Sequence, residues 1–291
     1  MKSFFNTFSN RVKGIIFILI ASLGFALMST CVKLSGDLPS LQKAFFRNLV
    51  GPFVAGYLVY KHNASFIGKR SSWNLLWWRS FAGTVGVVFN FYAIDHLILS
   101  DASMINKLSP IFTIIFSYIF LKEKLKYQQA IAILVAFSGM LLIVKPGFNI
   151  DVLPGIIGVL GAICAGVAYT CLRVLGKNEP YYTTVFVFST LSSVMLLPFL
   201  IYMYIPMSLI QFILLILSGI FATVAQFSLT IAYSYAPANE ISIFDYSNVI
   251  FTAIISLVVF GVFPDIFSIL GYIIIFSATF FMFSFNKRQA K

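Results

Sequence analysis

Two polar helix faces, one in each half of the chain, carry the residues best suited to chemistry. Asp245 heads one face and Asn106 heads its counterpart 139 residues earlier; each is followed by a Thr seven positions on and a Ser eleven positions on. Spacings near whole helical turns place such residues on one side of a helix. A carboxylate inside an apolar helix is costly unless it is paired or hydrated. Asp245 is therefore expected to be protonated, to pair with a base such as Arg79, or to face water; in a binding site it could contact a ligand ammonium group or carry a proton.

Further polar residues continue this pattern on neighbouring apolar segments. Arg79 and Asn90 are eleven positions apart on one predicted helix, with two glycines on the same face. Large amides need hydrogen-bonding partners in hydrocarbon, which favours an inward-facing cavity, although small residues on these faces also suit tight helix packing. Arg79 could instead snorkel to the membrane interface. The predicted substrate-binding residues are Arg79, Asn90, Asn106, Tyr169, Gln226 and Asp245.

The charges on these faces indicate the kind of ligand. Arg47 and Lys107 lie at a depth similar to that of Arg79, and either bind an anion or hydrate themselves. Both signs of charge, together with directed amides, favour a polar zwitterionic or anionic metabolite over a lipophilic drug. No His or Cys spacing resembles a zinc site, and no nucleophile has a neighbouring base. We therefore expect no metal, no cofactor and no enzymatic activity.

The elements that position these residues are expected to be membrane-spanning helices. The chain has 291 residues, of which 60% are hydrophobic, and no charge occurs between Glu179 and Glu240. A span needs roughly 20 mostly apolar residues, so this gap alone holds two spans. We predict an all-α integral membrane protein in which helices two, five, seven and ten are apolar all round and peripheral. The ten predicted helices span residues 14–33, 40–60, 73–94, 100–121, 127–145, 154–173, 181–203, 207–234, 239–261 and 265–285.

The sequence also repeats internally. The segment from Thr30 to Gly36 recurs 140 residues later, from Thr170 to Gly176. Five helices per half is an odd number, so the second copy must enter the membrane from the opposite side. We therefore predict two inverted five-helix repeats, residues 1–146 and 147–291, around a central cavity that alternates its access.

Charge distribution predicts the orientation. Basic residues gather on alternate loops, which lie on one side of the membrane. Because cytoplasmic loops carry the excess of Lys and Arg, both termini are expected in the cytoplasm and the protein in the plasma (inner) membrane. The net charge of +11 is then explained by topology, without a nucleic-acid partner. The expected partners are a small-molecule substrate, the lipid bilayer and a coupling ion such as the proton.

Ser100–Asp101 and Asn239–Glu240 resemble helix N-caps.

Several short motifs together resemble a known family. Phe45–Arg47, Leu108–Phe112, Phe120–Leu125 and Phe244–Tyr246 with Phe260–Asp265 are similar, in order and spacing, to the EamA-like family of the drug/metabolite transporter superfamily. Val262 departs from the glutamate usual there. The resemblance implies ten helices, inverted repeats and transport of a small organic metabolite such as an amino acid, a nucleoside-like metabolite or a vitamin.

Two other function classes compete with a transporter. A channel would share the polar lumen but would not need alternating access. An intramembrane enzyme would need a paired catalytic constellation, and Asp245 is the one deep carboxylate in the predicted spans.

Overall fold

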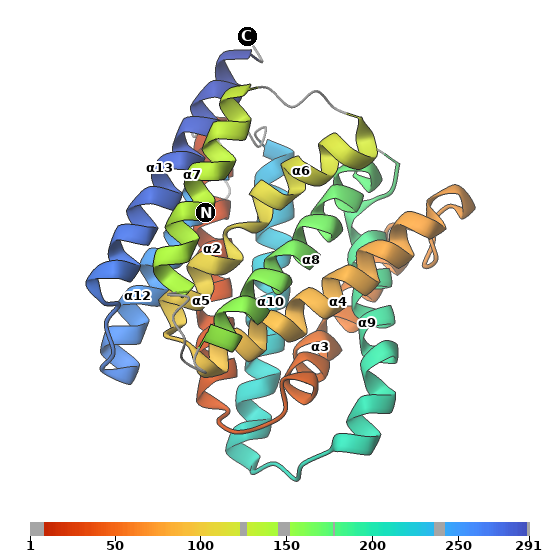
Figure 1. The fold of residues 1–291 in the computed structure, drawn as a ribbon. Helices are drawn as coiled ribbons and strands as arrows, with labels where there is room; N and C mark the ends of the chain where they lie inside the picture. Colours follow the sequence, from red (N-terminus) through yellow and green to blue (C-terminus); the bar gives the residue numbers. More distant parts are fainter. Residues whose placement is uncertain (1–8, 123–126, 145–151, 177, 236–241, 290–291) are drawn as a thin grey trace.

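The fold is helical throughout the residues that the computed structural model describes, which are 9–122, 127–144, 152–176, 178–235 and 242–289 (Figure 1). No β-strand occurs among them. The first half comprises α2 (Asn10–Leu34), α3 (Ser40–Lys61), the 3₁₀ turn η1 (Arg70–Ser72), α4 (Trp73–His96), α5 (Leu99–Asn106), α6 (Ser109–Leu121) and α7 (Tyr127–Val144). The second comprises α8 (Leu153–Leu175), α9 (Tyr181–Met203), α10 (Leu209–Tyr235), the 3₁₀ turn η3 (Ser242–Tyr246), α12 (Ser247–Phe260) and α13 (Ile266–Gln289).

Much of this helical material is long and apolar enough to cross a membrane. Within the described residues, five stretches meet both criteria, namely Asn10–Leu34, Leu99–Phe120, Leu153–Leu175, Tyr181–Met203 and Leu209–Leu229. Shorter apolar helices cover Ala130–Val144, Phe244–Phe260 and Ile266–Phe281. The prediction of an all-helical, multi-span chain is confirmed at this level.

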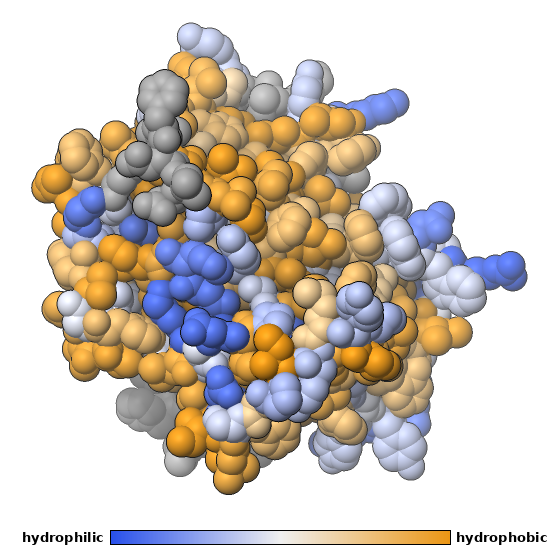
Figure 2. Space-filling view, turned by 60° about the horizontal axis from the view of Figure 1, so that its bottom comes forward, coloured by the Kyte–Doolittle hydropathy of each residue, from blue (hydrophilic) through white to orange (hydrophobic). Residues whose placement is uncertain are grey.

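The surface has the polarity expected of a protein surrounded by lipid. Large apolar side chains are strongly exposed, including Phe53, Tyr202 and Val258, whereas Lys43 and Asn48 are buried. Exposed apolar and buried polar groups are the arrangement that hydrocarbon demands. Figure 2, which brings the lower end of Figure 1 forward, shows hydrophilic side chains gathered in a central patch within a largely hydrophobic surface.

Helices α3 and α9 correct the prediction that helices two and seven are apolar all round. Helix α3 buries Gln42, Lys43, Arg47 and Asn48, and α9 buries Ser189 among other polar residues. These side chains point into the protein because no partner for them exists in lipid. The two helices pack along each other and against the interior helices α4 and α10.

The main helix pairs that pack together have counterpart pairs made of the corresponding helices of the other half. Helix α2 packs on α10 as α4 packs on α8, and α6 packs on α8 as α12 packs on α2. Helices α7 and α13 lie side by side at one flank of the molecule, and α3 and α9 lie together at the other (Figure 1).

Two predicted spans change helix geometry part-way, which corrects the expectation of continuous α-helices over 100–121 and over the described part of 239–261; these two positions are called the helix breaks below. Helix α5 ends at Asn106 and α6 starts at Ser109; in the second half η3 ends at Tyr246 and α12 starts at Ser247. The amide N–H of Leu108 bonds the carbonyl of Ile105 at 3.0 Å, three residues back rather than four, so the first break is also a 3₁₀-type turn. Such a turn inside a helix often marks a functional position.

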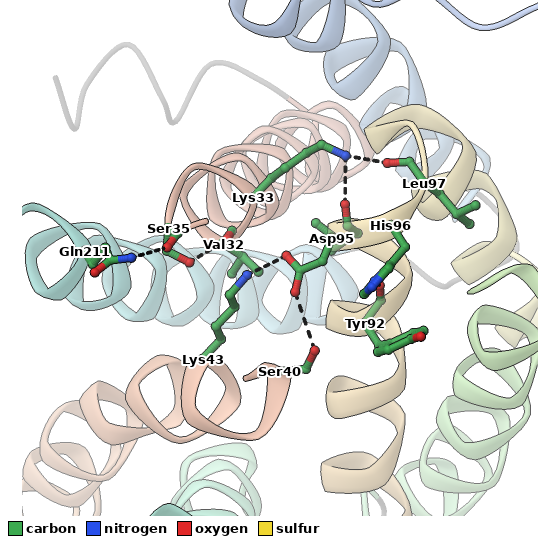
Figure 3. Close-up of polar contacts among 11 residues, drawn as sticks. Val32, Lys33, Ser35, Ser40, Lys43, Tyr92, Asp95, His96, Leu97 and Gln211 are labelled. Carbon is green, nitrogen blue, oxygen red and sulfur yellow. Dashed lines mark hydrogen bonds and ion pairs between the residues drawn. The ribbon is translucent and has the colours of Figure 1, made fainter. Parts of the chain in front are cut away.

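A polar cluster ties α2, α3 and α4 together where α2 ends (Figure 3). Lys43 Nζ lies 2.6 Å from Asp95 Oδ1, and the Lys43 side chain is fully buried. Lys33 donates to the carbonyl oxygens of Ile94 and Leu97, which helix α4 leaves unpaired at its C-terminus. Lys33, in the last turn of α2, thus satisfies carbonyl groups at the end of the neighbouring helix α4.

Candidate functional site

An ion pair joins the two helix breaks. Lys107 Nζ, from the break between α5 and α6, lies 2.5 Å from Asp245 Oδ2 in η3. The side chains are 13% and 23% exposed, so the pair is mostly shielded from solvent. Asp245 pairs with Lys107 and not with Arg79, one of the three alternatives left open by the sequence.

Neighbouring polar groups hold this pair in place. The hydroxyl of Ser22 on α2 donates to Asp245 Oδ1 at 3.2 Å, and the Asn248 amide donates to the Ser22 carbonyl at 2.9 Å. The hydroxyl of Tyr246 donates to the Lys107 carbonyl at 3.2 Å, at the break itself. The freed backbone and the carboxylate are thus satisfied by side chains from the opposite half of the sequence.

Arg79 is buried within the protein and does not reach for the membrane surface. It is 5% exposed, and its guanidinium lies over the ring of Phe188 on α9, 4.1 Å from the ring centroid. Gly83, one turn later on α4, makes room for this position, because a methyl group there would overlap Arg79 Nη1. The Nε of Arg79 has no hydrogen-bond partner. Among its two predicted locations, Arg79 occupies the inward one.

A small, open cavity lies beside Phe188, and α3, α9 and α10 form its walls. Arg47 lines it and is 8% exposed, while Arg47 Nη1 donates to Oδ1 of Asn48. Asn48 in turn donates to Ser192 Oγ at 2.6 Å. The residues lining the cavity are Arg47, Asn48, Gly51, Val185, Phe188, Ser189, Ala222, Thr223 and Gln226.

The six predicted site residues are brought together only in part. Gln226 lines the cavity with Arg47, and Tyr169 lies within electrostatic range of Asp245, Arg79 and Arg47. Tyr169 is 39% exposed.

Asn90 and Asn106 are less directly connected. Both are partly buried, and no hydrogen bond joins either amide to the other candidates among the described residues. At Asn90 the backbone of α4 passes close to Gly161 of α8. The structure sets Lys107, the residue after Asn106, against Asp245.

The rest of the two matched faces serves helix packing. Thr113 Oγ1 donates to the Ser109 carbonyl at 2.8 Å and lies against α8 at Gly166, while Ser117 accepts from Arg173 at 3.4 Å. Gly166 allows this close approach, because a Cβ there would lie 2.5 Å from Cβ of Phe112. Small residues with this role are common between helices in membranes.

Ser100 is not the predicted N-cap, since α5 begins at Leu99 and Ile98 occupies the N-cap without a side-chain bond, whereas Asp101 does lie in the first turn, where an acid complements the helix dipole. Asp101 Oδ1 also accepts a hydrogen bond from Tyr272 of α13. The other predicted cap, Asn239–Glu240, lies outside the described residues.

Sequence reasoning left Lys107 undecided and did not single out Phe188. A signal for the first was present: Pro110 follows Lys107 closely, and proline is favoured in the first turn of a helix because it lacks the amide hydrogen. It therefore marked a restart of the helix. Phe188 has no comparable signal, since it is one of 33 phenylalanines. No group of three or more His, Cys, Asp or Glu side chains within the described residues could hold a metal ion.

A lipid-facing helical shell around buried charges defines a multi-pass membrane protein. The model of the EamA-like transporter family matches residues 12–145 and again 153–284, so the chain belongs to that family. The chain is 30% identical to the pseudopaline exporter CntI of Pseudomonas aeruginosa over 265 residues, 90% of this chain and 93% of the exporter. It is 24% identical to an S-adenosylmethionine uptake transporter of Rickettsia bellii over 99% of this chain and 98% of that one.

The fold is also found among solved structures. One crystal structure superposes with a TM-score of 0.67 at 14% identity, covering 96% of this chain and 99% of the other. The family and its relatives place the chain among membrane transporters and not among enzymes.

Proposed function

We propose that this protein is a secondary transporter that moves a small polar organic metabolite across the plasma membrane by alternating access. One observation carries the proposal: α5 and α6 are separated by a break, a 3₁₀ turn precedes α12 at the repeat-related position, and an ion pair joins the two. Transporters built from repeats commonly place their substrate and ion sites at discontinuous helices near the midplane. The relatives include both an exporter and an uptake protein, so direction is a property of each member.

The two halves of this transporter are inverted five-helix repeats, residues 1–146 and 147–291, related by a pseudo-twofold axis. The exchange of helix pairs between the halves supports this symmetry. So do Lys122 and Gly261, 139 residues apart, which both end their helices in the left-handed conformation at φ 55° and 63°. The family model also matches each half separately. Both termini are then cytoplasmic, as the basic loops indicate.

The site of this transporter is the region between the helix breaks and the cavity beside Phe188. Arg79, Tyr169, Gln226 and Asp245 contribute to it, with Arg47 added from the cavity wall. Asn90 and Asn106 complete the predicted set from the adjoining parts of α4 and α5. The proton is the candidate coupling ion, with Asp245 as the group that would carry it.

Uptake into proteoliposomes tests the function. Labelled amino acids, nucleosides, vitamins and carboxylic acids are offered to liposomes with the purified protein, with its Asp245→Asn variant, and without protein. The proposal expects saturable uptake of at least one metabolite class, reduced in the variant. Flux that rises linearly with concentration would instead identify a channel, because a channel needs no conformational cycle.

A further inference from the structure

Two buried guanidinium groups face one region of the protein without any carboxylate to neutralise them. Arg47 lines the cavity, and Phe188, which lines the same cavity, carries the Arg79 guanidinium on its ring. The two arginines are close enough for their charges to repel. Within the described part of the chain, neither lies within ion-pairing distance of a carboxylate, and the Nε atoms of both lack hydrogen-bond partners.

The contacts that these arginines make offset only part of the cost of their burial. Removing an ion from water is costly even after relaxation of the protein. The cation–π contact of Arg79 with Phe188 and the single amide contact of Arg47 with Asn48 each return only part of that cost. A buried pair of cations left in this condition is poised to receive an anion.

The ion pair at the helix breaks decides between a zwitterionic and an anionic ligand. The sequence offered Asp245 as a contact for a substrate ammonium group, but Lys107 already occupies one oxygen of that carboxylate and Ser22 the other. The pair is neutral as a unit, so it leaves no unmatched negative charge. The unmatched charge of the region is that of Arg47 and Arg79, about two positive charges.

We propose that this region binds an organic anion bearing two carboxylate groups, one held by Arg47 and one by Arg79. The proposal rests on the proposed function, since it names the substrate class of that transporter. Guanidinium groups bind carboxylates through two parallel hydrogen bonds, and the buried Nε of each arginine has no hydrogen-bond partner among the described residues. Phe188, which contacts Arg79 and lines the cavity with Arg47, offers an apolar surface to the carbon chain between the carboxylates.

The test measures the thermal stability of the purified protein with defined probes. The probes are the aliphatic dicarboxylates succinate, glutarate and adipate, the dimethyl ester of each, inorganic phosphate, vesicles of phosphatidylglycerol, and tetraphenylphosphonium. A ligand that binds the native state raises the unfolding temperature in proportion to its occupancy. The variants are Arg47→Gln and Arg79→Gln, and the control is Lys61→Gln, which removes one positive charge from the exposed end of α3.

The proposal expects at least one dicarboxylate to stabilise the wild-type protein and its dimethyl ester to have no effect. Each arginine variant should weaken the affinity by about tenfold to a hundredfold, as expected for a lost charge-assisted contact of 1.5–3 kcal/mol, whereas Lys61→Gln should retain it. Comparison of ester and acid needs only the wild-type protein, so the test stands even if one variant fails to fold.

Five outcomes would overturn the assignment. Stabilisation by the esters or by tetraphenylphosphonium alone would identify an apolar or cation site. Stabilisation by phosphatidylglycerol alone would assign the arginines to a lipid headgroup, and by phosphate alone to an inorganic anion. Equal responses of all three variants would remove the cavity arginines from binding. Saturable uptake of a neutral or zwitterionic metabolite without any response to dicarboxylates would reject the anion site and leave the proposed transporter intact.

Discussion

Replacing Asp245 by Asn should break the ion pair between the two helix breaks while preserving the shape of the side chain. The remaining Oδ1 still accepts from Ser22, whose hydroxyl lies 3.2 Å away. The new amide nitrogen, however, faces the ammonium group of Lys107 where a carboxylate oxygen stood. The substitution therefore leaves the Lys107 ammonium group without its carboxylate partner and places an amide N–H donor opposite that ammonium donor.

The expected size of the effect follows from the burial of the pair. Exposed ion pairs contribute about 0.2–1 kcal/mol, and removing one partner of a fully buried pair costs about 3–5 kcal/mol. With exposures of 13% and 23%, this pair lies between these limits, and a loss of about 1–3 kcal/mol in unfolding free energy is expected. Transport should fall by a larger factor than stability, because the pair holds the two breaks together.

The assay is a double-mutant cycle with Lys107→Met, with unfolding in detergent and uptake into liposomes both measured. The double variant should regain much of the stability that Asp245→Asn loses, since no charge is then left unpaired. Strictly additive losses in the two single variants would refute the ion pair. Wild-type uptake by Asp245→Asn and by Asn106→Ala would remove the helix breaks from the substrate site.

Three further predictions concern packing, charge burial and topology. Gly166→Ala should destabilise the protein by about 1–3 kcal/mol in thermal unfolding, because the added Cβ would lie 2.5 Å from that of Phe112. Asp95→Asn should cost more than Lys43→Met in the same assay, because it strands a fully buried ammonium whereas the Asp95 side chain is 16% exposed. In a cysteine-free background, Lys69→Cys should react with membrane-impermeant maleimide only from the cytoplasmic side.

Matched controls sharpen these experiments. Gly176→Ala is the control for Gly166→Ala. Gly176 lies at the end of α8, the helix that contains Gly166, and an added Cβ there would meet only the Leu172 carbonyl at 3.3 Å. It should leave stability nearly unchanged, and equal losses in both variants would discount the close approach of α6 and α8. Asp37→Cys, on an exposed loop, should react from the outside only. Reaction of Lys69→Cys from outside intact cells would invert the topology.

The helical scaffold could be predicted from the sequence because apolar length alone fixes it. A run without charge between Glu179 and Glu240 leaves few alternatives to two spans, and α9 and α10 fill that run. The internal repeat predicted which residues correspond, and it drew attention to the region of Asn106 and Asp245, where Lys107 pairs with Asp245. The inward position of Arg79 was one of two readings, and its burial against Phe188 decides between them.

The interruption of the helices could not be predicted as readily. A helix and a 3₁₀ turn share nearly the same side-chain periodicity over a few residues, so the face containing Asp245 looked continuous. The role of α3 was missed for a different reason. Arg47 and Lys43 follow the start of a helix closely, where a cation usually reaches water, and only the packing of α9 against α3 shows that both are buried. Partners between distant helices, such as Ser22 with Asp245, depend on packing that one sequence does not reveal.

Trans-acceleration in proteoliposomes tests alternating access most directly. Liposomes containing the purified protein are preloaded with an unlabelled metabolite that the uptake screen identifies, and entry of the labelled form is then followed. The account predicts faster entry into preloaded liposomes than into empty ones, because the loaded carrier returns faster than the empty carrier. Entry that preloading leaves unchanged or slows would contradict an alternating carrier.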